Sequence, residues 1–259
     1  MRTPVVLLHA LGLGSAMWDA NRRDLLLAGY RVLAPDQRGY GATPLGTQSP
    51  DLNLVADDVA RALDDEDIDG VVLAGSSMGG YVAMSFVRRH ADRVRGLALL
   101  GTRAAADRAT AAVQRRAFAD LVADRATSAR AVEATIPLLV GDTTRAERPQ
   151  VVDQVCRMAL AVDPEAIAWS QRAIADRPDS FDVLRHVDVP SVVIAGDEDE
   201  LVAANDTRRM AEALPDCEMI VIPEAGHLTP IESPSAVTAA IKQLHRRLVP
   251  TPVGGGHRC

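Results

Sequence analysis

Short, uninterrupted aliphatic runs recur along the chain and predict its strands. They are Val5 to His9, Arg31 to Ala34, Val71 to Ala74, Gly96 to Leu100, Val192 to Ala195 and Met219 to Ile222. Runs without polar residues at alternate positions are typical of strands that are buried on both faces of a parallel sheet. The pattern therefore predicts a parallel sheet that is covered on both sides.

Helical periodicity fills most of the intervals between these runs. Examples are Asp24 to Ala28, Asp57 to Leu63, Met78 to His90 and Asp206 to Leu214. In the last predicted helix, Ser233 is placed to be the N-cap and Pro234 the first helical residue. One apolar stripe follows along that helix, formed by Val237, Ile241, Leu244 and Leu248. Alternation of strands and helices predicts an α/β fold with right-handed crossovers.

One long interval, from Ala104 to Asp188, has no strand pattern and only helical material. It is too long to be a loop, because unstructured connections beyond about 15 residues are uncommon in compact domains. We expect residues 1–103 and 189–249 to form the α/β core, and residues 104–188 to form a helical lid over one edge of the sheet. The glycine-rich segment 250–259 is expected to be a flexible tail.

Composition excludes several classes of protein. With 47% hydrophobic and 24% charged residues, the 259-residue chain has the composition of a folded globular protein rather than a disordered one. No apolar run approaches the roughly 18 residues needed to span a bilayer. The net charge of −7 argues against a nucleic-acid partner. The three cysteines lack metal-ligand spacing and favour a reducing, cytoplasmic location.

A turn of glycine and serine joins a predicted strand directly to a predicted helix. Gly75-Ser76-Ser77-Met78-Gly79 has the pattern G-x-S-x-G, in which the strained central residue exposes its side chain and small neighbours let strand and helix pass closely. Ser77 is therefore the candidate nucleophile, at a helix N-terminus that favours negative charge. Ser76 occupies the wrong position of the pattern, and the alternative interpretation is a strand-helix turn without chemistry.

A serine hydroxyl needs a base to remove its proton, and the base needs a carboxylate to orient it. His227 follows the run Met219 to Ile222, at the carboxyl end of a predicted strand, where sites of α/β proteins lie. Four acids follow the run Val192 to Ala195, namely Asp197, Glu198, Asp199 and Glu200. These residues alone leave the choice of acid open. The order serine, acid, histidine along the chain is that of α/β-hydrolases.

The chain resembles lidded serine hydrolases of the α/β-hydrolase fold over nearly its whole length. The resemblance is most specific in His9 to Trp18, Pro35 to Thr43, Gly75 to Gly80, Gly196 to Asp199 and Gly226 to Pro234. The most similar branches are enol-lactone hydrolases, small-ester hydrolases and the cofactor-free haloperoxidase/perhydrolase group. The resemblance implies a mainly parallel sheet flanked by helices, a helical lid, a shortened N-terminus without the β-hairpin of many relatives, and neither a metal nor an organic cofactor.

The same resemblance assigns further residues. Relatives carry their acid three residues after the strand-terminal glycine, which selects Asp199. By position, the backbone N–H groups of Leu11 and Met78 form the oxyanion hole, although Ala10 stands where relatives have glycine. The segment Asp36 to Gly41 resembles the D-x-R-G-x-G loop and implies a structural contact between Arg38 and a carboxylate. The segment Gly226 to Glu232 matches the pattern Gly-His-x-x-Pro-x-Glu.

We therefore expect a serine hydrolase that cleaves a small carboxylic ester or lactone through an acyl-enzyme. The alternatives are a thioesterase or a C–C bond hydrolase with the same triad, and a slow-turnover ligand receptor on the hydrolase fold. Candidate pocket residues are Trp18, Arg103 and Trp169, for which core packing (Trp18 and Trp169) and solvent exposure (Arg103) are the alternatives. The expected partner is the small-molecule substrate, and the sequence does not indicate an oligomeric state.

Overall fold

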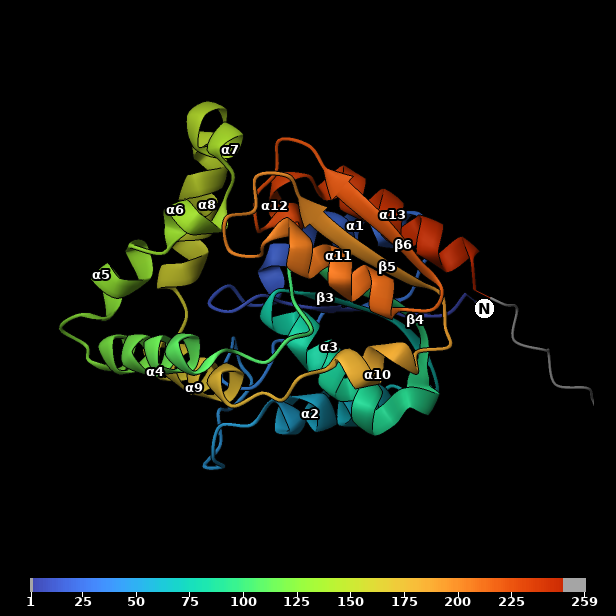
Figure 1. The fold of residues 1–259 in the computed structure, drawn as a ribbon, viewed down its shortest axis with the longest axis horizontal. Coiled ribbons are helices and arrows are strands. Elements are labelled where there is room, and N and C mark those ends of the chain that lie inside the picture. Colours follow the sequence, from blue (N-terminus) through green and yellow to red (C-terminus); the bar gives the residue numbers. More distant parts are fainter. Residues whose placement is uncertain (1, 249–259) are drawn as a thin grey trace, which may run out of the picture.

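The computed structural model describes residues 2–248, and its centre is a six-stranded sheet (Figure 1). The strands are β1 (Val5–Leu8), β2 (Val32–Leu33), β3 (Val71–Ser76), β4 (Val94–Leu100), β5 (Ser191–Gly196) and β6 (Cys217–Ile222). They lie in the order β2-β1-β3-β4-β5-β6, and every neighbouring pair is parallel. All six predicted strands are present, and the mainly parallel sheet is confirmed.

Helices cover both faces of this sheet. One face is covered by α1 (Asp19–Leu27) and α13 (Pro234–Arg246), and the other by α2 (Leu52–Asp65), α3 (Met78–His90) and α11 (Ala204–Ala213). Val5 and Leu7 of β1 pack on the face covered by α1 and α13, whereas Val6 and Leu8 pack on the face covered by α2, α3 and α11. Successive strand residues point to opposite faces, and both faces are buried here. Every residue of the strand must therefore be apolar, which explains the uninterrupted aliphatic runs.

Only helices connect β4 to β5, as the sequence predicts. They are α4 (Ala109–Ala123), α5 (Ser128–Glu133), α6 (Ile136–Leu139), α7 (Asp142–Glu147), α8 (Pro149–Leu160), α9 (Pro164–Ala175) and α10 (Phe181–Arg185). Figure 1 shows α4 to α9 grouped beyond one end of the sheet, with α4 and α9 packed together. Helix α10 differs from the others, because it contacts α3 and α11 in the layer that covers the sheet.

Short elements complete the chain: the 3-10 turns Ser15–Trp18 and Ala91–Arg93, and α12 (Thr229–Glu232). The predicted Arg38 contact is present, because its guanidinium donates two hydrogen bonds of 2.9 Å to the carboxylate of Asp58 on α2. Within residues 2–248 no helix is long and apolar enough to cross a membrane. The predicted tail, residues 250–259, lies outside the described residues.

Candidate active site

Ser77 occupies the tight turn between β3 and α3. Its backbone has φ 52° and ψ −111°, a left-handed conformation that is strained for a residue with a side chain. A Cβ atom at Gly75 would overlap the backbone of Gly79, and one at Gly79 would overlap the backbone of Leu8. Two hydrogen bonds to the Ser77 backbone hold the strained turn. The N–H of Ser77 donates to Leu100 O (2.8 Å), and its carbonyl accepts from Thr102 Oγ1 (3.0 Å). Both small residues of the G-x-S-x-G pattern are therefore required by close backbone approach.

The structure brings Ser77, His227 and Asp199 into one hydrogen-bonded chain. Ser77 Oγ lies 2.8 Å from His227 Nε2, and His227 Nδ1 lies 3.0 Å from Asp199 Oδ2. A carboxylate accepts hydrogen bonds, so we assign the ring proton to Nδ1, which leaves Nε2 free to accept the serine proton. The side chains of His227 and Asp199 are 5% and 2% exposed, so the pair is shielded from water.

Asp199 differs from the other three acids of its turn in what it contacts. Leu201 N and Val202 N donate to its Oδ1 at 2.8 and 3.0 Å. Burial by itself would raise the pKa of Asp199, but the hydrogen bond and charge of His227 and these two N–H groups outweigh it and leave the pKa below its ordinary value. Asp197 is exposed, and Glu198 and Glu200 bond to residues 143 and 145.

The buried carboxylate of Glu232, for which the sequence indicates no role, holds the loop of His227. Glu232 Oε1 accepts hydrogen bonds from the N–H groups of Gly226 and Leu228, at 3.0 and 3.1 Å, on either side of the histidine. Its Oε2 accepts from Gly141 N at 2.8 Å and Thr144 Oγ1 at 2.6 Å, which ties the same loop to the helical segment. The pattern Gly-His-x-x-Pro-x-Glu was the signal in the sequence, but it did not reveal these partners.

The loop after β1 reaches the serine from the other side, and Leu11 in this loop lines the same cavity as Ser77. Tyr40 Oη accepts a hydrogen bond from Gly12 N at 3.2 Å. Among the described residues other than glycine, only Asp67, Ser77 and Glu224 have a positive φ. Ala10 therefore adopts no conformation that would require glycine, and the departure from the family pattern is accommodated. Met78, the other predicted donor, is the first residue of α3, where N–H groups have no partner within the helix.

His9, which ends the predicted first strand, is fully buried beneath this loop. Burial lowers its pKa to about 4, against smaller opposing effects of the Ala10 carbonyl and Asp36. The neutral ring donates from Nδ1 to Ala10 O (2.9 Å) and accepts at Nε2 from Gln37 N (3.0 Å). Because both ring nitrogens are used, His9 links the loop of Leu11 to the segment that follows β2.

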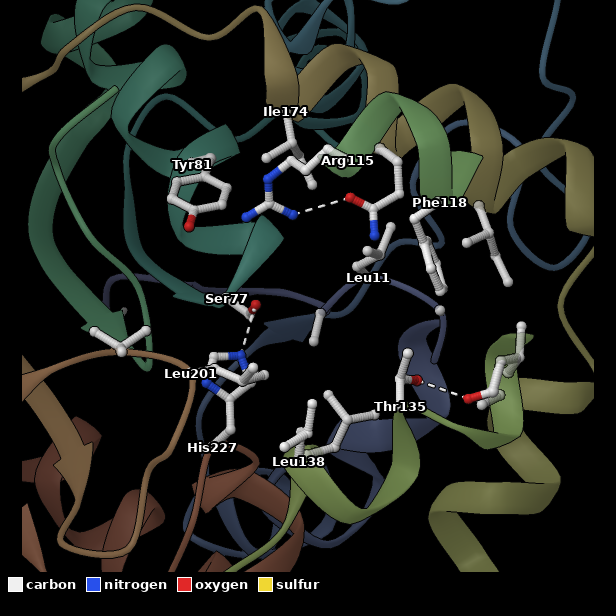
Figure 2. Close-up of a pocket in the computed structure, with 18 of the residues that line it drawn as sticks. Leu11, Ser77, Tyr81, Arg115, Phe118, Thr135, Leu138, Ile174, Leu201 and His227 are labelled. Carbon is white, nitrogen blue, oxygen red and sulfur yellow. Dashed lines mark hydrogen bonds between the residues drawn. The ribbon is translucent and has the colours of Figure 1, made fainter. Parts of the chain in front are cut away.

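Ser77 and His227 open onto a cavity of about 200 Å³ between the sheet and helices α4 to α9 (Figure 2). Most of its wall is apolar and comes from the helical segment, with Phe118, Val132, Leu138, Leu139, Ala159, Ile167 and Ile174. Polar groups on the wall besides the serine and histidine include Tyr81, Arg103, Arg115 and Gln171. A small apolar cavity with a few polar groups at a reactive serine is the form expected of a substrate pocket.

Of the three candidate pocket residues, the structure places only Arg103 on the cavity wall. Trp18 is fully buried in the core beneath α1 and α13, so the interpretation of it as a pocket wall is wrong. The prediction that Trp169 lines the pocket is also wrong, because its indole N–H donates a hydrogen bond to Gln48 O (3.0 Å), outside the cavity. The reason is helical geometry: at about 100° per residue, Ile167 and Gln171 share one face of α9, and Trp169 points to the other.

Three comparisons with known proteins agree with this architecture. Residues 3–234 match the sequence profile of the alpha/beta hydrolase fold family. The chain is 31% identical over 261 residues to the pimeloyl-(acyl-carrier protein) methyl ester esterase of Aromatoleum aromaticum, covering 95% of this chain and 99% of that protein. It is 30% identical over 237 residues to the dihydrolipoyllysine-residue acetyltransferase component of the acetoin cleaving system of Pseudomonas putida, covering 91% of this chain but 61% of that longer protein.

A solved structure is similar over nearly the whole chain. The thermophilic esterase from Thermogutta terrifontis, determined with malate bound, superimposes with a TM-score of 0.90 at 36% sequence identity. The match covers 94% of this chain and 89% of the esterase.

Proposed function

This chain belongs to the alpha/beta hydrolase fold family, and on that premise we propose that it is a serine hydrolase of small carboxylic esters or lactones. The observation that carries the proposal is the hydrogen-bonded chain from Ser77 Oγ through His227 to Asp199, at the wall of a small, mostly apolar cavity. The esterase names of the Aromatoleum and Thermogutta relatives support the same class of reaction.

Acylation begins at the serine. Ser77 Oγ attacks the ester carbonyl carbon while its proton moves to His227 Nε2, 2.8 Å away. Asp199 holds the imidazole in the required tautomer and stabilises the imidazolium that forms. When the tetrahedral intermediate collapses, the C–O bond to the leaving group breaks and His227 returns the proton to the departing oxygen.

Deacylation repeats these steps with water as the nucleophile. His227 takes a proton from water, the hydroxide attacks the acyl carbon, and Ser77 leaves with the proton returned through His227. A lactone is an internal ester and follows the same sequence, except that the leaving hydroxyl stays attached to the acyl group. In both halves of the reaction, charge develops on the carbonyl oxygen, and we assign the backbone N–H groups of Leu11 and Met78 to bind it.

We propose that residues 104–188 form a lid, with helices α4 to α9 over the cavity, and that residues 1–103 and 189–249 form the core. The support is the cavity wall, which takes most of its apolar side chains from α4 to α9. A methylene group in an apolar pocket is worth only about 1–3 kcal/mol, so selection among homologous esters is expected to be graded.

Labelling with a fluorophosphonate probe tests the proposal, because the probe reacts only with an activated serine. We expect the wild-type protein to label at one site and to show multiple turnover on p-nitrophenyl acetate. Ser77→Ala should abolish both, whereas the matched variant Ser76→Ala should retain them. Full labelling of Ser77→Ala would show that another residue is the activated nucleophile and reject the assignment of Ser77. A single turnover by the wild type would reject an enzyme and leave a receptor on the hydrolase fold.

A further inference from the structure

One side of the cavity is cationic. Arg103 and Arg115 line it together with Ser77 and His227. Arg103 follows β4 by three residues, at the carboxyl edge of the sheet, and β4 lies next to β3, the strand that Ser77 follows. Arg115 comes from α4, and Figure 2 shows its guanidinium turned into the cavity on the side of Tyr81 and Ser77. Two guanidinium groups therefore border a cavity whose other walls are largely apolar.

The carboxylate that pairs with Arg115 is that of Asp107, and it is shared with a second arginine, Arg177. Asp107 Oδ2 lies 2.5 Å from Arg115 Nε, and its Oδ1 lies 2.9 Å from Arg177 Nη2. Burial by itself would raise the pKa of Asp107, but Arg177 and Arg115 outweigh it and hold the pKa below its ordinary value. Asp107 is thus charged and its two oxygens are occupied. This one carboxylate pairs with two guanidinium groups, so the cluster of Asp107, Arg115 and Arg177 keeps a net positive charge.

Arg103 has no carboxylate within 4.0 Å anywhere in the part of the chain that the structure describes. Its one hydrogen bond to a backbone group is long, from Nη2 to Leu201 O at 3.4 Å. Its Nε is buried and lacks a partner among residues 2–248. Burial would lower the pKa of Arg103, but Tyr81, Asp107 and Asp206 outweigh it and leave the pKa above its ordinary value. The guanidinium is therefore charged and partly buried, it contacts Tyr81 and, at long range, Leu201 O, and among the described residues it has no carboxylate partner.

A charged group in this state favours one kind of ligand. Buried charges in proteins are paired, because an unpaired one loses its hydration without compensation. A guanidinium presents donors in a planar fork that matches a carboxylate with two parallel hydrogen bonds. A neutral ligand of the same shape would displace water from Arg103 and supply no acceptor in return. The cavity therefore discriminates by charge as well as by size.

Building on the serine hydrolase proposed above, we propose that the substrate is an ester or lactone that also carries a free carboxylate, and that Arg103 binds this carboxylate. Half-esters of small dicarboxylic acids and lactones of carboxylic acids belong to this class. Arg115 adds a second positive charge to the same wall, but its Nε is committed to Asp107 and its Nη1 donates to Gln171 Oε1 at 2.9 Å. Arg103 is accordingly the specificity-determining residue.

Two matched substrate pairs test the proposal. Monomethyl glutarate against methyl hexanoate places the carboxylate in the acyl part, and O-acetylglycolate against propyl acetate places it in the alcohol part. For each pair we measure the ratio of kcat/KM for the acidic ester to that for the neutral ester. We expect the ratio to exceed one for at least one of the two pairs in the wild type. In Arg103→Gln the ratio for that pair should fall about 10- to 100-fold, which corresponds to the loss of a hydrogen bond to a charged group.

Two further variants separate recognition from general effects of charge. Arg103→Lys keeps the charge but loses the planar fork, so its ratio should lie between those of the wild type and Arg103→Gln. Arg23→Gln removes the same charge from an exposed position on α1 and should leave the ratio unchanged. An equal ratio in the wild type and Arg103→Gln for both pairs would overturn the carboxylate site and leave the serine hydrolase intact.

Binding of glutarate to Ser77→Ala, measured by titration calorimetry, reads the same site without catalysis. We expect the dissociation constant to rise about 10- to 100-fold when Arg103→Gln is added. Unchanged binding, or no binding to either protein, would overturn the carboxylate site. This result does not depend on whether the protein hydrolyses any ester. Absence of fluorophosphonate labelling in the wild type would instead reject the proposed function, so the two failures are distinguishable.

Discussion

Removing the carboxylate of Glu232 should destabilise the fold and impair catalysis together, because one side chain serves both. Its two oxygens accept hydrogen bonds from Gly226 N, Leu228 N, Gly141 N and Thr144 Oγ1. The residue is 5% exposed, so water cannot readily replace it. Two of the donors flank His227, and the other two belong to the segment between β4 and β5.

The magnitude follows from the number of donors. A buried donor left without a partner costs about 1–3 kcal/mol, so Glu232→Ala should lower the free energy of unfolding by at least about 4 kcal/mol, allowing for non-additivity. That is a large fraction of the 5–15 kcal/mol typical of a domain. Glu232→Gln keeps one acceptor oxygen and presents an NH₂ group to the other pair of donors. Since Gly141 N–H cannot turn away but the Thr144 hydroxyl can, we expect a loss of about 2–3 kcal/mol.

Urea unfolding and steady-state kinetics measure the two effects on the same preparations. If Glu232→Ala does not fold, Glu232→Gln carries the test. We expect its midpoint to fall with an unchanged m-value, and its kcat to fall at least about tenfold, because a displaced His227 aligns poorly with Ser77. The control is Glu212→Gln, an exposed residue of α11, which should change neither quantity. A Glu232→Gln protein within about 0.5 kcal/mol of wild type and with full kcat would refute this reasoning.

Two further predictions concern His9 and the cavity wall. The pKa of His9 is about 4 in the folded state and near 6.5 unfolded, so the unfolded chain binds more protons below pH 6.5 and stability falls as the pH drops. Between pH 7 and pH 5 this group should remove about 2 kcal/mol of unfolding free energy, and urea titrations should show the loss in the wild type but not in His9→Gln; equal pH dependence in both would contradict it. Phe118→Ala should shift the preferred acyl length of p-nitrophenyl esters, because Phe118 lines the cavity, whereas Trp169→Ala should leave the length profile unchanged. The reverse result would place Trp169 back on the pocket wall.

The order and kind of the helices and strands could be predicted from the sequence, because local patterns of hydrophobic residues report burial directly. Each strand shows as an aliphatic run, since both of its faces are covered, and the prediction located all six to within a few residues. It was least exact where packing sets the ends, as at β4, which begins at Val94 rather than Gly96. The nucleophile position could also be predicted, because the turn at Ser77 depends on close contacts between residues that are near in sequence, Gly75 and Gly79.

Which distant side chains meet depends on how the elements pack in three dimensions. The sequence presents four adjacent acids, and the fold brings Asp199 alone to His227, through a turn whose backbone N–H groups also bind its carboxylate. It likewise joins Glu232 to Gly141, 91 residues away, and turns Trp169 from the cavity while leaving Arg103 on its wall. Periodicity specifies which face of an element is buried, but the partner across an interface depends on how elements distant in sequence pack, which no local pattern contains.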